Sequence, residues 1–432
     1  MEETLRTDGV ARTRTEPAGD LSRDSAVSAL SFKRKPLAPA LAALGFYSLW
    51  LFGMFLTGHR AMDFVMPGRE FITHSHRSSV IQFKTDRRYV RSKLGSDGQF
   101  FYYIAADPAN AQYYIDWPLY RYQRPVYPFT ARLLAFGQAA WVPYTLLLTN
   151  LLAVALGTWI LGSFLLRSGV SPWLALILAL APGTFLALQR DLTEPVDYAL
   201  LSAGVYLLFY GGRWRVVTSA LVFALAVLTR DKSVAFAAIF GLSLLLPSPA
   251  GQLARGWLDD IRGRIGRAAV FLAIALVPAL IATRILQRWL SVGDIALGSQ
   301  GQSLGGWSYM LHHFSRWRGP LILEAVTIML PGAVCAVMAL RALKRGEWRV
   351  EVGLLLVVLV GSLVTINTLY YQDYFGLIRV NDGVIFSALL CVPIFDRVTG
   401  GRRRWLWLAS SLWLSVVAVY LLTGAMWFPA RA

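Results

Sequence analysis

Charged residues, histidine and cysteine are scarce in this chain, and their scarcity excludes several classes of protein. Of the 432 residues only 16% are charged, against about 25% in a soluble domain, and there are 5 histidines and 2 cysteines. Cys335 and Cys391 both lie in apolar runs, so neither a disulfide scaffold nor a cysteine-based metal site is indicated. The low charge and the apolar runs together exclude a soluble globular enzyme and a disordered protein.

Motifs for nucleotides and catalytic zinc are also missing. The chain contains no GxxxxGK(S/T) loop, no GxGxxG fingerprint and no HExxH pair. His74 and His76 form a single HxH, for which two solvated loop residues are a simpler interpretation than a metal site. We therefore expect neither ATP-driven transport nor zinc proteolysis, and no cofactor, with a divalent metal left open.

Apolar runs fill most of the remaining sequence. Hydrophobic residues make up 56% of the chain and the mean hydropathy is +0.50. Because a helix needs about 20 residues to cross the bilayer core, we predict an all-α polytopic membrane protein with about eleven transmembrane helices. The expected spans are 37–56, 141–166, 172–189, 194–210, 215–229, 233–247, 267–286, 320–342, 351–370, 383–396 and 405–427.

The excess of basic residues predicts the orientation of these spans. Lys and Arg number 42 and the net charge is +17, which in a soluble protein would suggest nucleic acid. In a polytopic protein, short cytoplasmic loops collect this charge, so we expect membrane lipids and no nucleic acid as partners. Every second turn is basic, which predicts a cytoplasmic N-terminus, an outer C-terminus, and outer segments at 57–140 and 287–319. An Arg-rich, Ala- and Leu-rich composition favours a bacterial plasma membrane.

The same patterns divide the chain into three parts. Residues 1–36 are polar and of mixed charge, and they read as a disordered cytoplasmic tail. Residues 37–247 form a first module with the large outer loop 57–140, in which short interfacial helices are expected. Residues 248–432 form a C-terminal transmembrane module.

The first candidate for chemistry is an acidic residue ahead of a short helix in the outer loop. Phe100 and Ile104 repeat at helical spacing, and Asp97 stands where an N-cap would be. One interpretation is an interfacial helix capped by Asp97. The other is a carboxylate at the lip of an apolar cavity, whose pKa is raised by desolvation and which takes a proton. Asp107, at the end of the same helix, is a second candidate.

The second candidate is a basic and aromatic stretch later in the same loop. Arg121 and Arg124 stand among tyrosines that include Tyr122 and Tyr127, and Tyr102 belongs to the preceding helix. Such residues are ordinary at a membrane interface. Arginine also binds phosphate through its planar fork, and tyrosine rings stack on sugars, so a site for a phosphate with an attached sugar is equally consistent.

The third candidate is the set of ionisable residues where the outer turns meet the spans. Arg190 and Glu194 flank the junction of the third and fourth spans, and Arg230 and Lys232 join the fifth and sixth. Such residues are either interfacial or, where they dip inward, mark a site. All three candidates fall on the outer side, which predicts that they converge.

The order of these elements resembles the GT-C superfamily of integral-membrane glycosyltransferases, and most closely the branch of the GPI second-mannose transferases and their bacterial relatives. SDGQFFY at 96–102 is similar to the aspartate motif of the first outer loop, and RPVYP at 124–128 is partly similar to the segment that follows. Further on come TE at 193–194, the basic turn GGRWR at 211–215 and LTR at 228–230. The resemblance covers roughly residues 40–245.

This resemblance implies an inverting hexosyltransferase that moves mannose or another hexose from a polyprenyl-phosphate donor to a lipid or glycan on the outer face. It implies that Asp97 is the base, with Asp107 and Glu194 assisting at the acceptor or sugar. The donor phosphate would contact Arg121, Arg124, Arg190, Arg230 and Lys232, and the sugar or acceptor would contact Tyr102, Tyr122 and Tyr127. A lipid or solute transporter and a non-catalytic relative in envelope assembly stay open as alternatives, and the oligomeric state stays unassigned.

Overall fold

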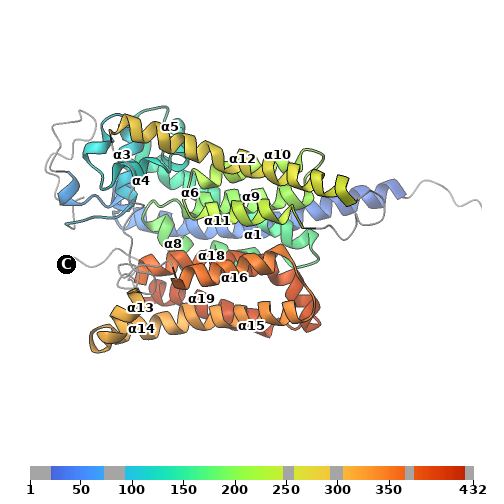
Figure 1. Cartoon of the computed structure of the whole chain (residues 1–432). Helices are drawn as coiled ribbons and strands as arrows, with labels where there is room; N and C mark the ends of the chain where they lie inside the picture. Colours follow the sequence, from blue (N-terminus) through green and yellow to red (C-terminus); the bar gives the residue numbers. More distant parts are fainter. Residues whose placement is uncertain (1–20, 73–92, 247–256, 292–304, 365–373, 424–432) are drawn as a thin grey trace, which may run out of the picture.

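Helices are the regular structure of this molecule. The computed structural model describes residues 21–72, 93–246, 257–291, 305–364 and 374–423, and within these ranges it contains no strand (Figure 1). The longer helices are α1 (Leu21–Leu56), α6 (Val142–Arg167), α9 (Glu194–Tyr210), α10 (Arg215–Val227), α11 (Ser233–Ser243), α12 (Trp257–Trp289), α14 (Phe314–Glu324), α15 (Leu330–Lys344), α16 (Val350–Val364), α18 (Tyr374–Thr399) and α19 (Arg404–Thr423). The shorter ones are α2 (Ala61–Val65), α3 (Gly98–Ala106), α4 (Pro118–Tyr122), α5 (Val126–Leu134), α7 (Leu176–Ala179), α8 (Pro182–Gln189) and α13 (Gly305–His312).

Fewer helices meet the requirements of a membrane span than the sequence pattern predicts. Within the described ranges five are long and apolar enough, namely Pro36–Leu56, Ala139–Arg167, Ile261–Trp289, Leu321–Lys344 and Ile378–Thr399. A sixth is added if Pro172–Ala179 and Pro182–Gln189, which meet at 53°, count as one broken span. The expected count of about eleven is therefore not confirmed. The difference is one of length, since α10 and α11 reach only about 20 and 17 Å against a bilayer core of about 30 Å.

The first helix begins earlier than the composition suggests. α1 begins at Leu21, inside the segment 1–36 that was expected to be disordered, and residues 1–20 lie outside the described ranges. Residues 21–35 contain neither glycine nor proline, so nothing in that stretch interrupts a helix. The helix therefore extends into residues 21–36 of the segment that was expected to be disordered.

The helices form two layers that share α18. α1 to α12 lie in one layer, and α15, α16 and α19 lie in the other (Figure 1). α18 contacts α7 and α8 in the first layer and α15 and α16 in the second. One apolar core runs through both, because Phe223 of α10 and Phe271 of α12 belong to the same cluster as Met338 of α15 and Trp413 of α19. The two modules expected from the sequence, 37–247 and 248–432, are therefore packed into a single body.

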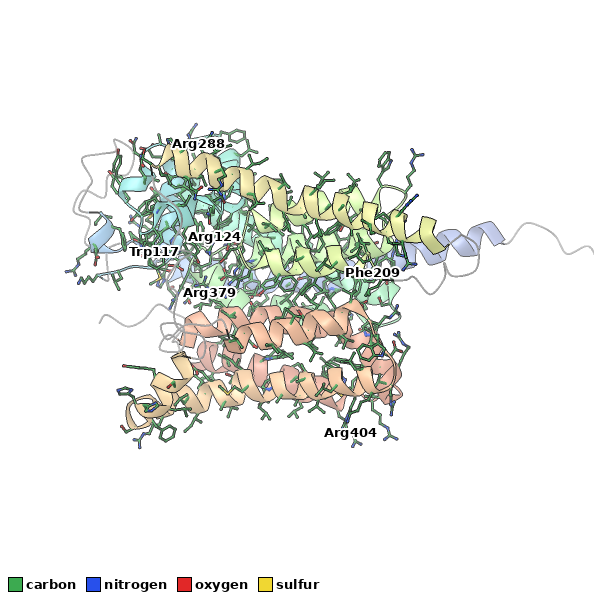
Figure 2. All side chains as sticks on the ribbon, viewed as in Figure 1. Trp117, Arg124, Phe209, Arg288, Arg379 and Arg404 are labelled. Atoms are coloured by element: carbon green, nitrogen blue, oxygen red, sulfur yellow. The ribbon has the colours of Figure 1, made fainter. Side chains whose placement is uncertain are left out.

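The two ends of the helices are chemically distinct. Ser168, Tyr210, Arg349 and Arg397 line one cavity of about 190 Å³, so the ends of α6, α9 and α18 and the beginning of α16 lie together. We call this the basic end, because the turns there carry the arginines expected in the cytoplasm. The other end, the site end, carries the short helices of the first loop. Figure 2 shows the two ends, with Trp117, Arg124 and Arg379 at one and Phe209 and Arg404 at the other.

The first loop is built into the protein and does not simply rest on a surface. All nine residues of α3 are buried. The turn before it is held by Gln99, whose Oε1 accepts a hydrogen bond from the Gly68 N–H at 2.8 Å and whose Nε2 donates to the Leu94 carbonyl at 2.7 Å. A Cβ atom at Gly98 would lie 2.0 Å from the Arg190 carbonyl oxygen, so only glycine allows α3 to approach α8 this closely.

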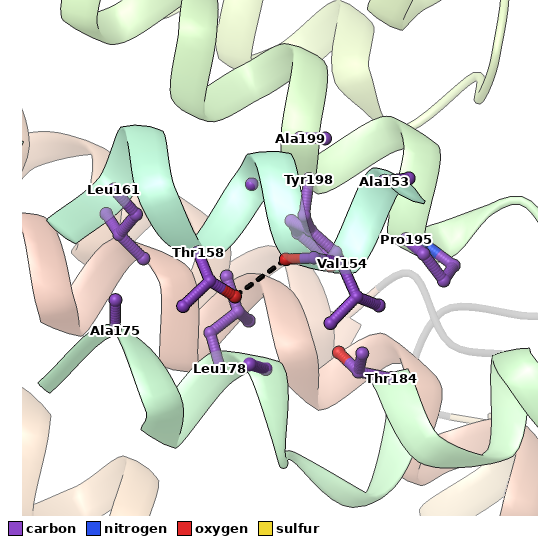
Figure 3. Close-up of a pocket in the computed structure, with 12 residues that line it drawn as sticks. Ala153, Val154, Thr158, Leu161, Ala175, Leu178, Thr184, Pro195, Tyr198 and Ala199 are labelled. Carbon is purple, nitrogen blue, oxygen red and sulfur yellow. Dashed lines mark hydrogen bonds between the residues drawn. The ribbon is translucent and has the colours of Figure 1, made fainter. Parts of the chain in front are cut away.

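A small apolar cavity lies beneath the site end, between α6 and the broken pair α7–α8. Figure 3 shows Val154, Thr158 and Leu178 among its lining residues, together with Thr184 and Pro195. Its volume of about 20 Å³ is comparable to the space that one water molecule occupies. It therefore has no room for a sugar or a lipid chain, and the chemistry has to be sought at the surface above it.

Candidate active site

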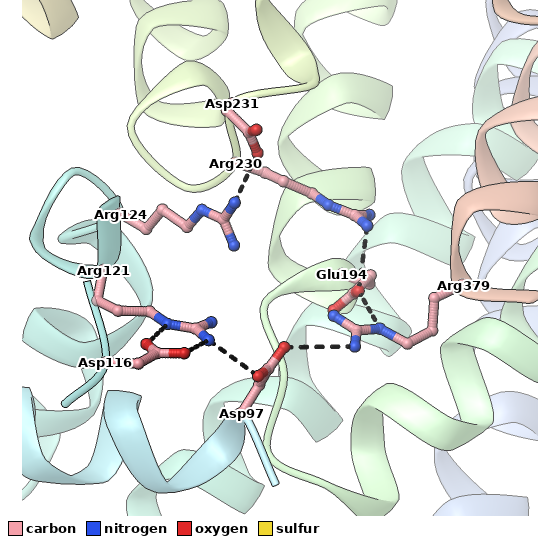
Figure 4. Close-up of polar contacts among 8 residues, drawn as sticks. All are labelled: Asp97, Asp116, Arg121, Arg124, Glu194, Arg230, Asp231 and Arg379. Carbon is pink, nitrogen blue, oxygen red and sulfur yellow. Dashed lines mark hydrogen bonds and ion pairs between the residues drawn. The ribbon is translucent and has the colours of Figure 1, made fainter. Parts of the chain in front are cut away.

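Eight ionisable side chains from separate parts of the chain lie together at the site end, and we call them the ion-pair network (Figure 4). They are four carboxylates and four guanidinium groups: Asp97, Asp116, Glu194, Asp231, Arg121, Arg124, Arg230 and Arg379. Ion pairs join six of them in a continuous series, and Arg124 with Asp231 forms a separate pair beside it. The first loop supplies four of them, the beginning of α9 and the turn between α10 and α11 supply three, and α18 supplies Arg379. The convergence expected of the three sequence motifs is thus present among these side chains.

Asp97 stands between two arginines. Its Oδ1 lies 3.0 Å from Nη2 of Arg121, and its Oδ2 lies 3.7 Å from Nη1 of Arg379. The side chain makes no hydrogen bond to the first turn of α3, because the residue already has helical dihedral angles of −56° and −26°. The interpretation of Asp97 as a helix cap is therefore wrong. With 40% of its side chain exposed, the carboxylate remains accessible from outside.

The electrostatic surroundings of Asp97 differ from the expectation. Partial loss of water raises the pKa of this carboxyl group, but the charges of Arg121 and Arg379 outweigh that effect and lower the pKa to about 2. The sequence analysis expected the apolar surroundings to raise it. The direction of the pKa shift was predicted wrongly for two reasons. Arg121 was expected to bind only phosphate, and Arg379 is far from Asp97 in the sequence.

Arg121 is fixed on several sides. Its Nε lies 2.6 Å from Oδ1 of Asp116 and its Nη2 lies 2.8 Å from Oδ2 of the same carboxylate, which is a bidentate pair. The guanidinium carbon also lies 4.3 Å from the centre of the Phe100 ring. Arg121 is buried. It is therefore a rigid donor, aimed at Asp97 before any substrate arrives.

Glu194 links the two layers of the molecule. Its Oε1 lies 2.6 Å from Nε of Arg379 and 3.2 Å from Nη2 of Arg230. The Glu194 side chain is 0% exposed. A fully buried carboxylate with two arginine partners is held as an anion and positions both guanidinium groups, so its direct contact with an incoming substrate is limited.

Arg124 occupies the far side of the network. Its Nη2 lies 2.8 Å from Oδ1 of Asp231, and its guanidinium carbon lies 4.1 Å from the centre of the Tyr120 ring. Asp231 is the residue after the LTR motif and is half-exposed. The pair joins the first loop to the turn between α10 and α11, and Tyr120 supplies an aromatic face that the sequence analysis did not single out.

The network as a whole is close to neutral before any ligand binds. Its four guanidinium groups balance its four carboxylates. Burial and the neighbouring charge of Arg230 lower the pKa of Lys232, the N-cap residue of α11, to about 7, so this amino group adds only a partial positive charge near pH 7. Each arginine has five N–H donors, and the ion pairs described use only some of them, so the network can also donate hydrogen bonds to an anion. The arrangement suits a phosphate group next to an accessible carboxylate.

Of the predicted site residues, Asp107 lies apart from this network, whereas the backbone of Arg190 borders it. Asp107 ends α3, about 15 Å along the axis from Asp97, and its Oδ2 accepts a hydrogen bond from Asn110 at 3.0 Å. Arg190 follows α8 and its carbonyl packs against Gly98. Asp107 is therefore not in contact with the carboxylate proposed as the base.

The predicted tyrosines are largely packing residues. Tyr127 is fully buried, with its hydroxyl 2.8 Å from Asn150 Nδ2, so its ring offers no face to a sugar. The hydroxyl of Tyr122 donates to the Pro108 carbonyl at 2.6 Å, and its ring meets that of Trp289 edge to face. Tyr102 is also buried. The sugar-binding prediction is therefore wrong for Tyr127, and Tyr120 is better placed.

Three members of the network, Asp116, Asp231 and Arg379, were missed by the sequence analysis, and Asp231 directly follows the LTR motif. Arg379 lies in α18 just before the expected span 383–396, and an arginine at the head of an apolar run is a recognisable signal. Asp116 has no comparable signal, because it stands in an irregular stretch between short helices. Among the residues the structure describes, no group of three or more His, Cys, Asp or Glu side chains is arranged to hold a metal ion.

Comparison with known proteins adds no assignment. No protein-family model matches the chain, and no curated protein is similar to it. The functional argument therefore rests on the site and on the motifs within the chain.

Proposed function

We propose that this protein is a membrane glycosyltransferase that moves a hexose from a polyprenyl-phosphate donor to a lipid or glycan acceptor. The observation that carries the proposal is the half-exposed carboxylate of Asp97 between Arg121 and Arg379. An accessible carboxylate next to fixed guanidinium groups provides a proton acceptor and an anion site within a few ångströms. Both are required to activate a hydroxyl group and to stabilise a departing phosphate.

The chemistry is a single displacement at the anomeric carbon. The acceptor hydroxyl loses its proton to Asp97 while its oxygen forms a bond to the anomeric carbon. The bond between that carbon and the phosphate oxygen breaks, and the polyprenyl phosphate leaves as an anion. The guanidinium groups of Arg121 and Arg379 stabilise this developing charge. Because attack and departure occur on opposite faces of the sugar, the configuration inverts.

Donor binding itself would make Asp97 a better base. In the unliganded protein the two arginines lower the pKa of Asp97 to about 2, which makes it a weak proton acceptor. A phosphate that takes up N–H donors of Arg121 and Arg379 adds a negative charge close to Asp97. That charge opposes the effect of the arginines and raises the pKa of the carboxyl group. Proton transfer is therefore coupled to the presence of the donor.

We further propose that the site end faces the outside of the plasma membrane and that the chain crosses it about eleven times. The meeting of basic turns at one end and of the ion-pair network at the other supports this orientation. Glu194 begins α9 and pairs with Arg230 after α10, which supports α9 and α10 as a hairpin that reaches from the site end and back. In this proposal α9 and α10 each cross the membrane, and the bilayer is locally thinned around them.

The test compares two aspartates of the same helix. Purified full-length protein is supplied with a polyprenyl-phosphate hexose and a lipid acceptor extract, and glycosylated product is measured by mass spectrometry. Asp97→Asn keeps the shape of the side chain but accepts no proton, and we expect turnover to fall by on the order of 10²- to 10⁴-fold. The matched control Asp107→Asn should retain most of its turnover.

Two results would refute separate parts of the proposal. Retained turnover in Asp97→Asn with loss of turnover in Asp107→Asn would refute the assignment of Asp97 as the base and would move that role to Asp107. Turnover of a nucleotide sugar by the purified protein without any lipid carrier would remove the polyprenyl-phosphate donor from the scheme.

A further inference from the structure

A second cavity lies at the basic end, far from the ion-pair network. It has a volume of about 880 Å³ and is formed by the ends of α15 and α18, the turn that follows α18 and the beginning of α19. Six of its lining residues are basic and none is acidic: Arg341, Lys344, Arg345, Arg397, Arg402 and Arg404. The volume falls in the range of about 300–1,000 Å³ that is typical of small-molecule sites.

Most of these cations lack a carboxylate partner. Within the described part of the chain, Arg397 pairs with Glu347 at 3.1 Å, and Arg345 donates to the Val398 carbonyl. Glu351 also acts on the charge of Arg397, and Asp396 pairs with Arg403, whose Nε lies 2.9 Å from Oδ2 and which does not line the cavity. The positive charge of the cavity is therefore largely uncompensated by the protein.

Helix dipoles explain only part of this charge. Arg341 and Lys344 lie in the last turn of α15, where a cation is favourable because the C-terminal end of a helix is negative. Arg402 and Arg404 stand at the N-terminal end of α19, where a cation is unfavourable. The same end of α19 favours an anion. The positive charges of Arg402 and Arg404 are thus repelled by the positive end of the α19 dipole, unless a negative group lies between these two residues and α15.

The surrounding aromatic residues indicate the level of the cavity relative to the membrane. Trp405 lines it, Trp407 on the same helix is 67% exposed, and Trp348 after α15 is 75% exposed. Exposed tryptophans gather at the level of lipid headgroups. A ligand at this depth is reached from the membrane as readily as from water.

We propose that this basic cavity binds the headgroup of an anionic glycerophospholipid, with the phosphodiester between Arg402 and Arg404 on one side and Arg341 and Lys344 on the other. Basic pockets between helices at the membrane surface bind anionic headgroups in this way. The proposal does not rest on the proposed sugar transfer, because the cavity and the ion-pair network lie at opposite ends of the helices.

The experiment titrates full-length protein in a neutral detergent with dioleoyl phosphatidylglycerol, and native mass spectrometry counts bound lipid. Dioleoyl phosphatidylcholine is the uncharged comparison and should not bind specifically. Each arginine near a headgroup contributes about 1 kcal/mol, so Arg402→Gln with Arg404→Gln should weaken binding on the order of 30-fold. Arg402→Lys with Arg404→Lys keeps the charge and should bind within a few-fold of wild type, which separates loss of charge from misfolding.

The matched control removes the same charge at the same end but outside the cavity. Arg213, in the turn between α9 and α10, and Arg215, the first residue of α10, are exposed beside the exposed Trp214 and line neither cavity of the basic end. Arg213→Gln with Arg215→Gln should leave phosphatidylglycerol binding within about twofold. An equal loss in this control would overturn the proposal, because the attraction would then be general. Displacement of the lipid by an equal concentration of inorganic phosphate would overturn the assignment to a lipid.

Discussion

Single residues in the network differ greatly in how much water surrounds them. Glu194 is completely enclosed, whereas Asp97 keeps 40% of its side chain in contact with solvent. A buried charge depends on its partners for stability, and an exposed one does not. The two acids are therefore expected to fail in different ways when they are replaced, Glu194 through folding and Asp97 through chemistry.

Replacement of Glu194 tests the structural role. Glu194→Gln leaves the guanidinium groups of Arg230 and Arg379 without their shared counter-ion, and breaking a buried pair costs about 3–5 kcal/mol. We expect a large fall in the thermal unfolding temperature of the detergent-solubilised protein. The control Glu347→Gln breaks the exposed pair with Arg397 and should cost about 0–1 kcal/mol. Similar losses in both variants would contradict the role assigned to Glu194.

The acid stability of the protein follows from the lowered pKa of Asp97. A carboxyl group whose pKa is about 2 when folded and about 3.9 when unfolded stabilises the folded state above pH 4. That stabilisation is lost as the pH falls from 4 through 2. We expect Asp97 to contribute no pH dependence between pH 5 and 8. Thermal unfolding of wild type and Asp97→Asn across pH 2–6 should converge at the acid end, and parallel curves throughout would contradict the ion pairing.

At the scale of elements, the position of α3 depends on one close contact. Gly98→Ala would place a Cβ atom 2.0 Å from the Arg190 carbonyl oxygen, so α3 must move away from α8. Overpacking of this kind costs about 1–3 kcal/mol, and the shift also displaces Asp97. Gly45→Ala is the control, since nothing lies within 4 Å of that position in α1 and alanine favours a helix. The thermal unfolding temperature should fall in Gly98→Ala and not in Gly45→Ala. An unfolding temperature equal to that of the wild type in Gly98→Ala would show that the contact is not tight.

The elements also show what the sequence could and could not indicate. Each expected span contains helix where the structure describes it, because long apolar runs leave the backbone few alternatives. The agreement is incomplete: the span 172–189 is broken between α7 and α8, and the spans that contain α10 and α11 end in turns. The Asp-Gly-Gln motif marked a real turn before α3. Whether helices as short as α10 and α11 cross a membrane depends on the local thickness of the bilayer, which the amino-acid sequence does not determine.

Partners distant along the chain were beyond sequence reasoning. Arg379 is 185 positions from Glu194, and no local pattern relates them. The pKa of Asp97 is lowered by the charges of Arg121 and Arg379, and neither contact was predicted, so the direction of the shift was predicted wrongly. The burial of Tyr127 was missed for a similar reason, since a tyrosine in an Arg-rich stretch reads as a surface residue until its neighbours in α6 are known.

For the whole molecule, the orientation in the membrane can be measured with two introduced thiols. Tyr113 at the site end and Trp348 at the basic end are both exposed, and Cys335 and Cys391 are buried. In intact cells a membrane-impermeant maleimide should label Tyr113→Cys and should reach Trp348→Cys only after permeabilisation, because basic turns stay in the cytoplasm. Labelling of both from the same side would contradict the proposed orientation.

The position of Arg379 in α18 also has a consequence for biosynthesis. Membrane proteins are inserted while they are being made, from the N-terminus onward. Glu194 and Arg230 are therefore synthesised before their partner in α18. The Arg379 contacts to Asp97 and Glu194 form only after α18 has been inserted against α8. A ribosome-bound chain that ends before α18 has no completed network, so the site is finished only late in translation.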